Sequence, residues 1–180
     1  MTSDDQLPGQ LELYPDLPAP AGRTGPVHPG QVEATAYGMP RPQGSMDAQR
    51  IRGGPRAGQL AVFHQNHTTL LPWRDSVIYA LRAAHCGDPF TGPVGVLVVF
   101  TMKRPVSLPK RRHSYPAKKP DLDKLLRGVL DAATYAGVWR DDSQVVEATA
   151  RKHYTADGLP DVLKTPGAFI RVWPMPEVVL

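Results

Sequence analysis

Four aspartates in the second half of the chain have a spacing that could hold a metal ion. Asp121 and Asp123 stand two positions apart, and Asp141 and Asp142 follow as neighbours further along. Carboxylate oxygens with no cysteine or histidine beside them favour a hard divalent cation, Mg²⁺ or Mn²⁺. Such an ion activates water and neutralises negative charge on a phosphate, so these acids point to phosphodiester hydrolysis.

The first pair can converge only where a helix begins. Side chains two positions apart within a helix point about 200° apart, which is too far to share one ion. Asp121 must therefore be extended or occupy the N-cap, while Asp123 lies in the first helical turn. Pro120 favours such an abrupt start because it pushes Lys119 into extended backbone.

The second pair directly precedes an expected strand, where neighbouring side chains face opposite sides. Only one of these two acids is then expected to join the cluster: if Asp142 faces the same way as Gln144, Asp141 faces elsewhere. Simpler roles remain open for all four acids. An aspartate can cap a helix, and an Asp-Asp-Ser run before a strand can form a turn.

An α+β domain is expected around these acids, with a small mixed sheet packed by two main helices. The second helix is the clearest element, because apolar residues recur at helical spacing from Leu122 to Ala133 and Gly137 follows its end. The first helix is expected to begin near Leu71, with Pro72 in its first turn. Strands are expected at residues 32–37, 59–64, 94–101, 144–154 and 168–173, and a mobile loop at residues 47–58.

Composition divides the chain into two parts. Prolines and glycines recur through residues 1–30 without apolar periodicity, which predicts a disordered tail, and residues 31–176 are predicted to form one folded domain. Without the first 30 residues the chain holds 20 bases and 13 acids, a net charge of +7. That balance favours a polyanionic partner.

Cysteine usage and hydropathy indicate a reducing, cytoplasmic setting. Cys86 is the only cysteine, which excludes an internal disulfide and a cysteine-rich zinc site. The longest apolar run, residues 94–100, is far shorter than the ~20 residues that span a bilayer, so no membrane partner is expected. The acidic start lacks the apolar segment of a signal peptide.

A basic loop is expected at residues 103–119, which contain no acid. It would contact phosphates and supply salt-dependent affinity with little base specificity. The simpler interpretation is a solvated loop. The candidate phosphate-binding residues are Lys103, Arg104, Lys110, Arg111, Arg112, Lys118 and Lys119, together with Lys124 on the helix that follows.

Two segments resemble the signature of RusA-family endodeoxyribonucleases of the phage and prophage kind. They are Pro120-Asp121-Leu122-Asp123 followed by Arg127 and Asp131-Ala132, and Asp141-Asp142-Ser143-Gln144-Val145. The upstream run Gly38-Met39-Pro40-Arg41-Pro42-Gln43-Gly44-Ser45 also resembles the Gly-x-Pro entry segment common in that family. The resemblance extends over residues 32–173.

The resemblance implies a small homodimer that binds four-way DNA junctions and, with Mg²⁺, makes paired symmetrical nicks leaving 5′-phosphates. It implies that Asp121, Asp123 and Asp142 are ligands, and it is the main reason to prefer Asp142 over Asp141. On this reading Tyr115 could wedge into a junction. Trp73 and Trp139 could do the same, but both are expected in the core.

Two departures from the family pattern concern the helix. Lys124 stands where the family usually has asparagine, and Arg127 where it has a catalytically important lysine. Arginine keeps the charge and can grip a phosphate bidentately, but its high pKa prevents it from delivering a proton. The simpler interpretation of Arg127 is an i, i+4 ion pair with Asp123 or Asp131.

A short motif in the tail suggests a further partner. Gln10, Leu11, Leu13 and Tyr14 resemble the extended peptide that bacterial replication proteins insert into the sliding clamp. Short linear motifs dock in this way from disordered, proline-flanked segments. Pentapeptides also match by chance, so clamp binding is a hypothesis of its own.

Three functions therefore compete. The first is a Mg²⁺-dependent Holliday-junction resolvase of DNA recombination and repair. The second is a related nuclease that prefers flaps or other branched DNA, because nothing in the residues encodes four-way geometry. The third is a non-catalytic, basic DNA-binding protein whose acids are caps and turns.

Overall fold

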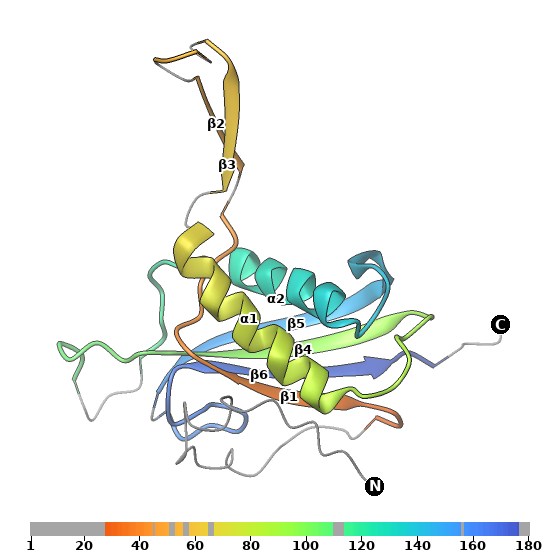
Figure 1. The fold of residues 1–180 in the computed structure, drawn as a ribbon. Helices are drawn as coiled ribbons and strands as arrows, with labels where there is room; N and C mark the ends of the chain where they lie inside the picture. The colour runs from red at the N-terminus through yellow and green to blue at the C-terminus, as the bar shows by residue number, and fades with distance from the viewer. Residues whose placement is uncertain are drawn as a thin grey trace, which may run out of the picture.

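The computed structural model confirms the expected α+β fold, with a four-stranded mixed sheet and two long helices (Figure 1). The structure describes residues 28–44, 46–50, 53–55, 58–64, 67–109, 114–155 and 157–176. The predicted clamp peptide and most of the predicted tail lie outside these ranges. Within them, every helix is too short or too polar to cross a bilayer.

The sheet has the order β1-β6-β4-β5, which leaves β1 and β5 at its edges. β4 pairs antiparallel with β6 and parallel with β5, and β6 pairs antiparallel with β1. The parallel pair requires a crossover connection, which α2 supplies. The strands are β1 (Val32–Tyr37), β4 (Val94–Met102), β5 (Val145–Tyr154) and β6 (Gly167–Pro174).

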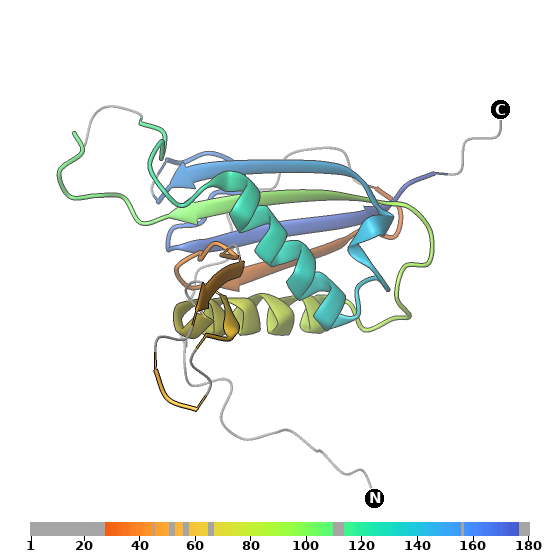
Figure 2. The same cartoon turned by 90° about the horizontal axis from the view of Figure 1, so that it is seen from above.

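Both helices, α1 (His67–Ala84) and α2 (Leu122–Ala136), cover the same face of the sheet (Figures 1 and 2). Their apolar sides enclose the main core, in which Val77, Leu125 and Phe100 are fully buried. Gly137 ends α2 in the left-handed conformation at φ 80°, which glycine adopts at little cost. The helical periodicity and the predicted end of α2 are therefore confirmed.

The predicted loop at residues 47–58 was wrong in part. β2 (Met46–Arg50) pairs antiparallel with β3 (Leu60–His64), and the resulting hairpin projects away from the domain (Figure 1). Its first strand is short and poor in β-branched residues, so it gives a weak sequence signal. The turn between the strands includes Gly54, with φ 83°, a backbone conformation that glycine adopts readily.

The first helix also begins earlier than predicted. α1 starts at His67, so Pro72 lies in its second turn instead of its first. A proline there removes one backbone hydrogen bond of the helix. Packing of the helix on the core offsets this loss. Leu70, just before Pro72, and Trp73, just after it, are both buried there.

Candidate active site

The start of α2 has the geometry that the sequence required of Asp121 and Asp123. Asp121 is the N-cap residue in extended backbone, with φ −71° and ψ 141°, and Asp123 lies in the first turn. The carbonyl oxygen of Asp121 accepts the first helical bond, 3.1 Å from the Leu125 nitrogen. The predicted helix start is confirmed.

The carboxylate of Asp121 does not cap the helix. It accepts no capping hydrogen bond, although the residue occupies the N-cap position. Its nearest cation is the Lys124 Nζ at 3.5 Å, and both side chains are almost half exposed, so water weakens this ion pair strongly. Asp123 is also exposed. Both carboxylates therefore face solvent at the positive end of a helix, where an anionic cluster is tolerated.

Lys152 on β5 fixes the backbone that leads into this helix. Its Nζ donates to the carbonyl oxygens of Lys118, at 3.1 Å, and Pro120, at 2.8 Å. Sequence reasoning missed this residue. The alternation of β5 gives a signal for it, because Lys152 shares the helix-facing side of the strand with Ala150 and Tyr154, which pack on the core.

The Gly-x-Pro segment crosses the middle of α2. The backbone nitrogen of Gln43 donates to the Lys124 carbonyl at 3.0 Å, and its side-chain amide donates to the Asp131 carboxylate. The Asp131 carboxylate therefore already has a hydrogen-bond donor in the Gln43 side chain. Within the described ranges Arg127 forms no ion pair with either acid considered for it, and its side chain is exposed.

Extended chain was predicted for both Asp141 and Asp142; Asp141 has it, with φ −153° and ψ 143°, but Asp142 does not. Residues Asp142–Gln144 form a short 3-10 helix, and Asp141 is its N-cap, with its Oδ1 accepting from the Ser143 nitrogen at 2.9 Å. Hydrogen bonds from the Ser143 side chain and, secondly, from its backbone nitrogen hold the pKa of Asp141 below its usual range. Asp141 is therefore a cap, and the Asp-x-x-Gln pattern was the sequence signal for it.

Gln144 holds this turn in place. Its Oε1 accepts from the backbone nitrogens of Arg140 and Asp141, at 2.9 and 3.2 Å. Its Nε2 donates to the carbonyl oxygens of Phe90 and Gly92, at 2.8 and 2.9 Å, in the segment before β4. Asp142 is exposed on the turn that these bonds fix.

Asp142 lies at the opposite end of α2 from Asp121 and Asp123. The 15 residues of α2 correspond to about 22 Å at 1.5 Å per residue. The strand β5 gives a second estimate of this separation. Lys152, near its end, contacts the residue before Asp121, and residues 145–152 span about 23 Å of strand. Figure 2 shows the first turn of α2 beside the end of β5, while its last turn lies apart from β5 and the segment that follows leads back to the start of β5.

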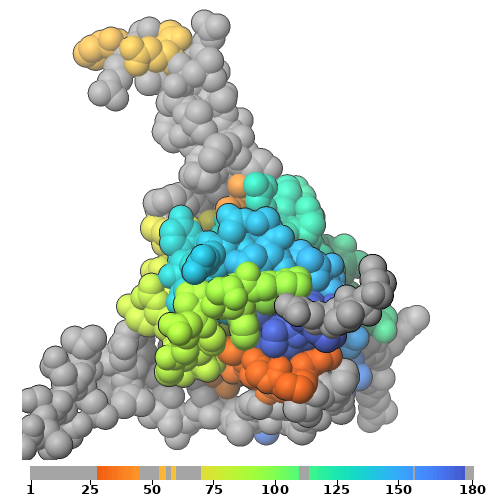
Figure 3. All heavy atoms as spheres, turned by 90° about the vertical axis from the view of Figure 1, so that its right-hand side faces the viewer, coloured from red at the N-terminus to blue at the C-terminus, as the bar shows by residue number. Residues whose placement is uncertain are grey.

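One copy of the described chain therefore does not assemble the three proposed ligands. No three His, Cys, Asp or Glu side chains in these ranges come together closely enough to hold a metal ion. In Figure 3, which views the end of the domain where β5 begins, the light-blue atoms around residues 140–150 lie on the surface.

The predicted basic loop is anchored to the domain at both ends. Lys152 holds its last residues, as described above. At its beginning, Arg104 lies 3.5 Å from the buried Asp157 carboxylate and donates to the Pro109 carbonyl at 2.9 Å. Arg104 thus has a structural partner, while Lys103, Lys118 and Lys119 are exposed.

The remaining candidates of the loop and the aromatic residues are placed as follows. Lys110, Arg111 and Arg112 lie outside the described residues. Trp73 and Trp139 are buried, as expected of core residues. Tyr115 is 69% exposed and can contact a bound molecule.

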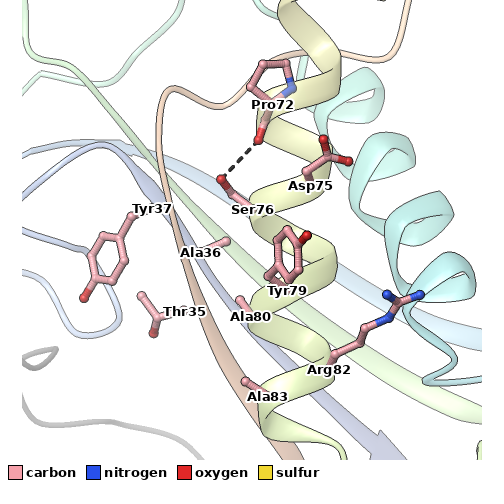
Figure 4. A pocket seen from close by; sticks show the side chains of 10 residues that line it. All are labelled: Thr35, Ala36, Tyr37, Pro72, Asp75, Ser76, Tyr79, Ala80, Arg82 and Ala83. Atoms are coloured by element: carbon pink, nitrogen blue, oxygen red, sulfur yellow. Dashed lines mark hydrogen bonds between the residues drawn. The ribbon is translucent and has the colours of Figure 1, made fainter. Parts of the chain in front are cut away.

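A groove of about 700 Å³ lies elsewhere, between β1 and α1 (Figure 4). Tyr37 lines one side and Tyr79 the other, with Asp75 and Arg82 as its charged groups. None of its lining residues is a predicted site residue. The candidate acids instead lie on open surface, which suits a ligand as large as DNA.

Comparison with known proteins identifies the family. Residues 48–162, which include both helices and all four acids, match the family described as endodeoxyribonuclease RusA. The chain is also similar to the uncharacterized protein YqaN of Bacillus subtilis, with 29% identity over 142 residues, 73% of this chain and 94% of that protein. The match to the family spans more than half of the chain, and the observed α+β fold agrees with it. The chain therefore belongs to the RusA family of endodeoxyribonucleases.

Proposed function

We propose that this protein is a Mg²⁺-dependent, structure-specific endonuclease that resolves Holliday junctions by paired symmetrical nicks in DNA recombination and repair. The observation that carries the proposal is the start of α2. There two exposed carboxylates, one of them at an N-cap position that it does not use for capping, follow directly on an exposed basic segment. If Asp121 served only as a helix cap, its side chain would form the capping hydrogen bond, and it does not.

The active form is a homodimer whose metal site is shared between two copies. Asp121 and Asp123 supply one part of the ligand set at the start of α2, and Asp142 follows the other end of this helix, which is about 22 Å long. A two-fold symmetric partner with its α2 reversed would bring its own Asp142 to that place, and the reverse contact would build a second site. Two equivalent sites are also what paired symmetrical nicking requires.

The three carboxylates fit a hard divalent cation by their chemistry, since all the donors are oxygen. When bound, Mg²⁺ (or Mn²⁺) neutralises charge on the scissile phosphate and activates water for its hydrolysis. The protein's own cations then bind and orient the DNA. Lys118 and Lys119 contact flanking phosphates. Arg127, one helical turn after Asp123, donates bidentate hydrogen bonds to two oxygens of a phosphate.

A cleavage assay tests the proposal. The purified protein is incubated with a mobile four-way junction or with a flap substrate, each with and without Mg²⁺. We expect symmetrical nicks in the junction with Mg²⁺ only, and binding without nicking by Asp123→Asn. Asp75→Asn, which changes an exposed acid of α1, serves as the matched control and should cut normally.

The other outcomes separate the competing functions. Preferential cutting of the flap would show a branched-DNA nuclease of a different specificity. Junction binding without cleavage by the wild type in Mg²⁺ and in Mn²⁺ would show a non-catalytic DNA-binding protein. Unimpaired cleavage by Asp123→Asn would show that this aspartate is not a ligand of the metal site.

A further inference from the structure

The groove in Figure 4 runs along the outer edge of β1. β1 ends the sheet order, and among the described residues β6 is the only strand that pairs with it. The Gly38 nitrogen donates to the Pro166 carbonyl at 3.0 Å, so the alternation of an antiparallel ladder turns the N–H and C=O groups of Thr35 away from β6. Thr35 lines the groove, and its outward groups can bond an added strand.

Small side chains on α1 leave room for such a strand. Ser76, Ala80 and Ala83 recur at helical spacing on the side of α1 that faces β1 (Figure 4). Tyr79, which is 56% exposed, forms the outer wall of the groove. A strand added to β1 would therefore lie against this flank of α1 and bury alternate side chains in the groove.

The chain itself contains a segment of the required length and pattern. β1 has six residues, and residues 9–14 are a six-residue stretch between Pro8 and Pro15. Because proline has no backbone N–H to donate, the two prolines would limit an added strand to this stretch. Leu11 and Leu13 would share one face of the strand and could both enter the groove.

This segment can reach β1 within one chain. The turn at residues 28–31, in which the Gln31 nitrogen donates to the His28 carbonyl at 3.1 Å, comes directly before β1. The 13 residues 15–27 join that turn to the segment. When extended they span up to about 43 Å, whereas β1 is about 20 Å long.

The tether and the charge both favour the chain's own segment over a separate molecule. A short flexible tether holds a peptide at an effective concentration on the order of millimolar, so a modest affinity fills the groove. Residues 1–30 hold four acids and one base, and the remainder of the chain carries a net charge of +7. These opposite charges draw the segment toward the domain.

We propose that residues 9–14 dock on the edge of β1 as a fifth strand of the sheet, with Leu11 and Leu13 in the groove beside α1. While they are docked, these residues are not available to another protein. A partner that binds this peptide must therefore compete with the domain for it. The inference goes beyond the nuclease function and does not depend on it.

Hydrogen exchange in the full chain, followed by NMR without DNA or metal, tests the docking at one amide. The N–H of Thr35 should exchange slowly in the wild type, and the double change Leu11→Asp with Leu13→Asp should speed its exchange at least about tenfold. The N–H of Ala36 faces β6, so its exchange should not change. Leu17→Asp, outside the proposed strand, is the matched control and should behave as the wild type.

A second pair of variants alters the groove instead of the peptide. Ala83 and Ala84 are both exposed on the last turn of α1, but only Ala83 lines the groove. Ala83→Glu places a charge where the leucines would dock, so it should speed the exchange of Thr35 as the peptide variant does. Ala84→Glu should leave this exchange unchanged. Circular dichroism confirms that each variant is folded.

A spin label separates docking within one chain from docking between copies. Cys86, the only cysteine, is exposed three residues after Ala83 and can carry a nitroxide. The label should broaden the amide signals of residues 9–14 in the same chain, and Ala83→Glu should restore them. In a mixture of isotope-labelled chains without nitroxide and unlabelled chains that carry it, these signals should stay sharp.

Several results would overturn the docking. They are fast exchange of Thr35 in the wild type, exchange that neither the leucine variant nor Ala83→Glu alters, or broadening that is as strong in the mixture as within one chain. The last result would assign the groove to a second copy. None of these readouts depends on cleavage, so the proposed function and this docking can fail independently.

Discussion

Lys152 on β5 donates a hydrogen bond of 2.8 Å to the carbonyl oxygen of Pro120, the residue directly before Asp121. The same ammonium group also reaches the Lys118 carbonyl at 3.1 Å. One lysine thus ties the end of the basic loop and the start of α2 to the sheet. The position of the Asp121 carboxylate depends on this bond, because the side chain belongs to the backbone that Lys152 holds.

Replacing Lys152 should loosen the proposed metal site without abolishing DNA binding. Lys152→Met keeps much of the side-chain bulk but loses both hydrogen bonds to the loop, so the Mg²⁺ concentration for half-maximal nicking should rise about tenfold. Junction affinity without metal should change little. Lys164→Met, at an exposed position in the loop before β6, is the matched control. An unchanged Mg²⁺ dependence in Lys152→Met would show that this contact does not support the site.

The two neighbouring aspartates should respond differently to substitution. Asp141→Asn should retain nicking, because asparagine caps a helix as well as aspartate does. Asp142→Asn should lose nicking and keep junction binding, because it removes a proposed ligand charge. A gel assay of both variants on one junction measures the contrast. The opposite result, an inactive Asp141→Asn and an active Asp142→Asn, would exchange their roles.

The lowered pKa of Asp141 predicts a pH-dependent contribution to stability. A carboxyl whose folded pKa is depressed stabilises the fold fully above its ordinary value, 3.8 here, and loses this effect as the pH falls through the folded pKa. The urea midpoint of the wild type should therefore exceed that of Asp141→Asn by more at neutral pH than at about pH 2. A difference that is the same at both values would mean that the ionised carboxylate does not contribute.

The exposed lysines at the end of the basic loop should set the salt dependence of binding. Lys118→Ala and Lys119→Ala should each lower the slope of log affinity against log salt by about 0.9. Lys164→Ala again serves as the control. Measurements on junctions of two sequences should give the same loss for both, since phosphate contacts carry little sequence information. A loss confined to one sequence would indicate base contacts instead.

Local patterns predicted the backbone at the start of α2, which carries the first two candidate ligands. The spacing of Leu122, Leu125, Leu126 and Val129 predicts α2, and the two-residue separation of Asp121 and Asp123 requires the helix to begin between them. Both follow from helix geometry alone, which is the same in every fold. The structure agrees with each of these predictions.

The position of Asp142 could not be predicted in this way. Where it lies relative to Asp121 depends on the crossover that carries α2 over the sheet, which places the two acids at opposite ends of one helix. The hydrogen bonds of Lys152 and Gln144 are equally non-local, since each joins segments more than 30 residues apart. The β2–β3 hairpin was missed because its first strand carries a weak strand signal.

The most direct test of a shared metal site is a mixture of two inactive variants. Asp123→Asn and Asp142→Asn are co-expressed with different tags, and the mixed dimer is purified and assayed for junction nicking with Mg²⁺. In that dimer the intact Asp123 of one copy meets the intact Asp142 of the other, so one of its two sites is complete. We predict that nicking returns in the mixed dimer to about half the wild-type rate. A mixed dimer as inactive as either parent would contradict the shared site.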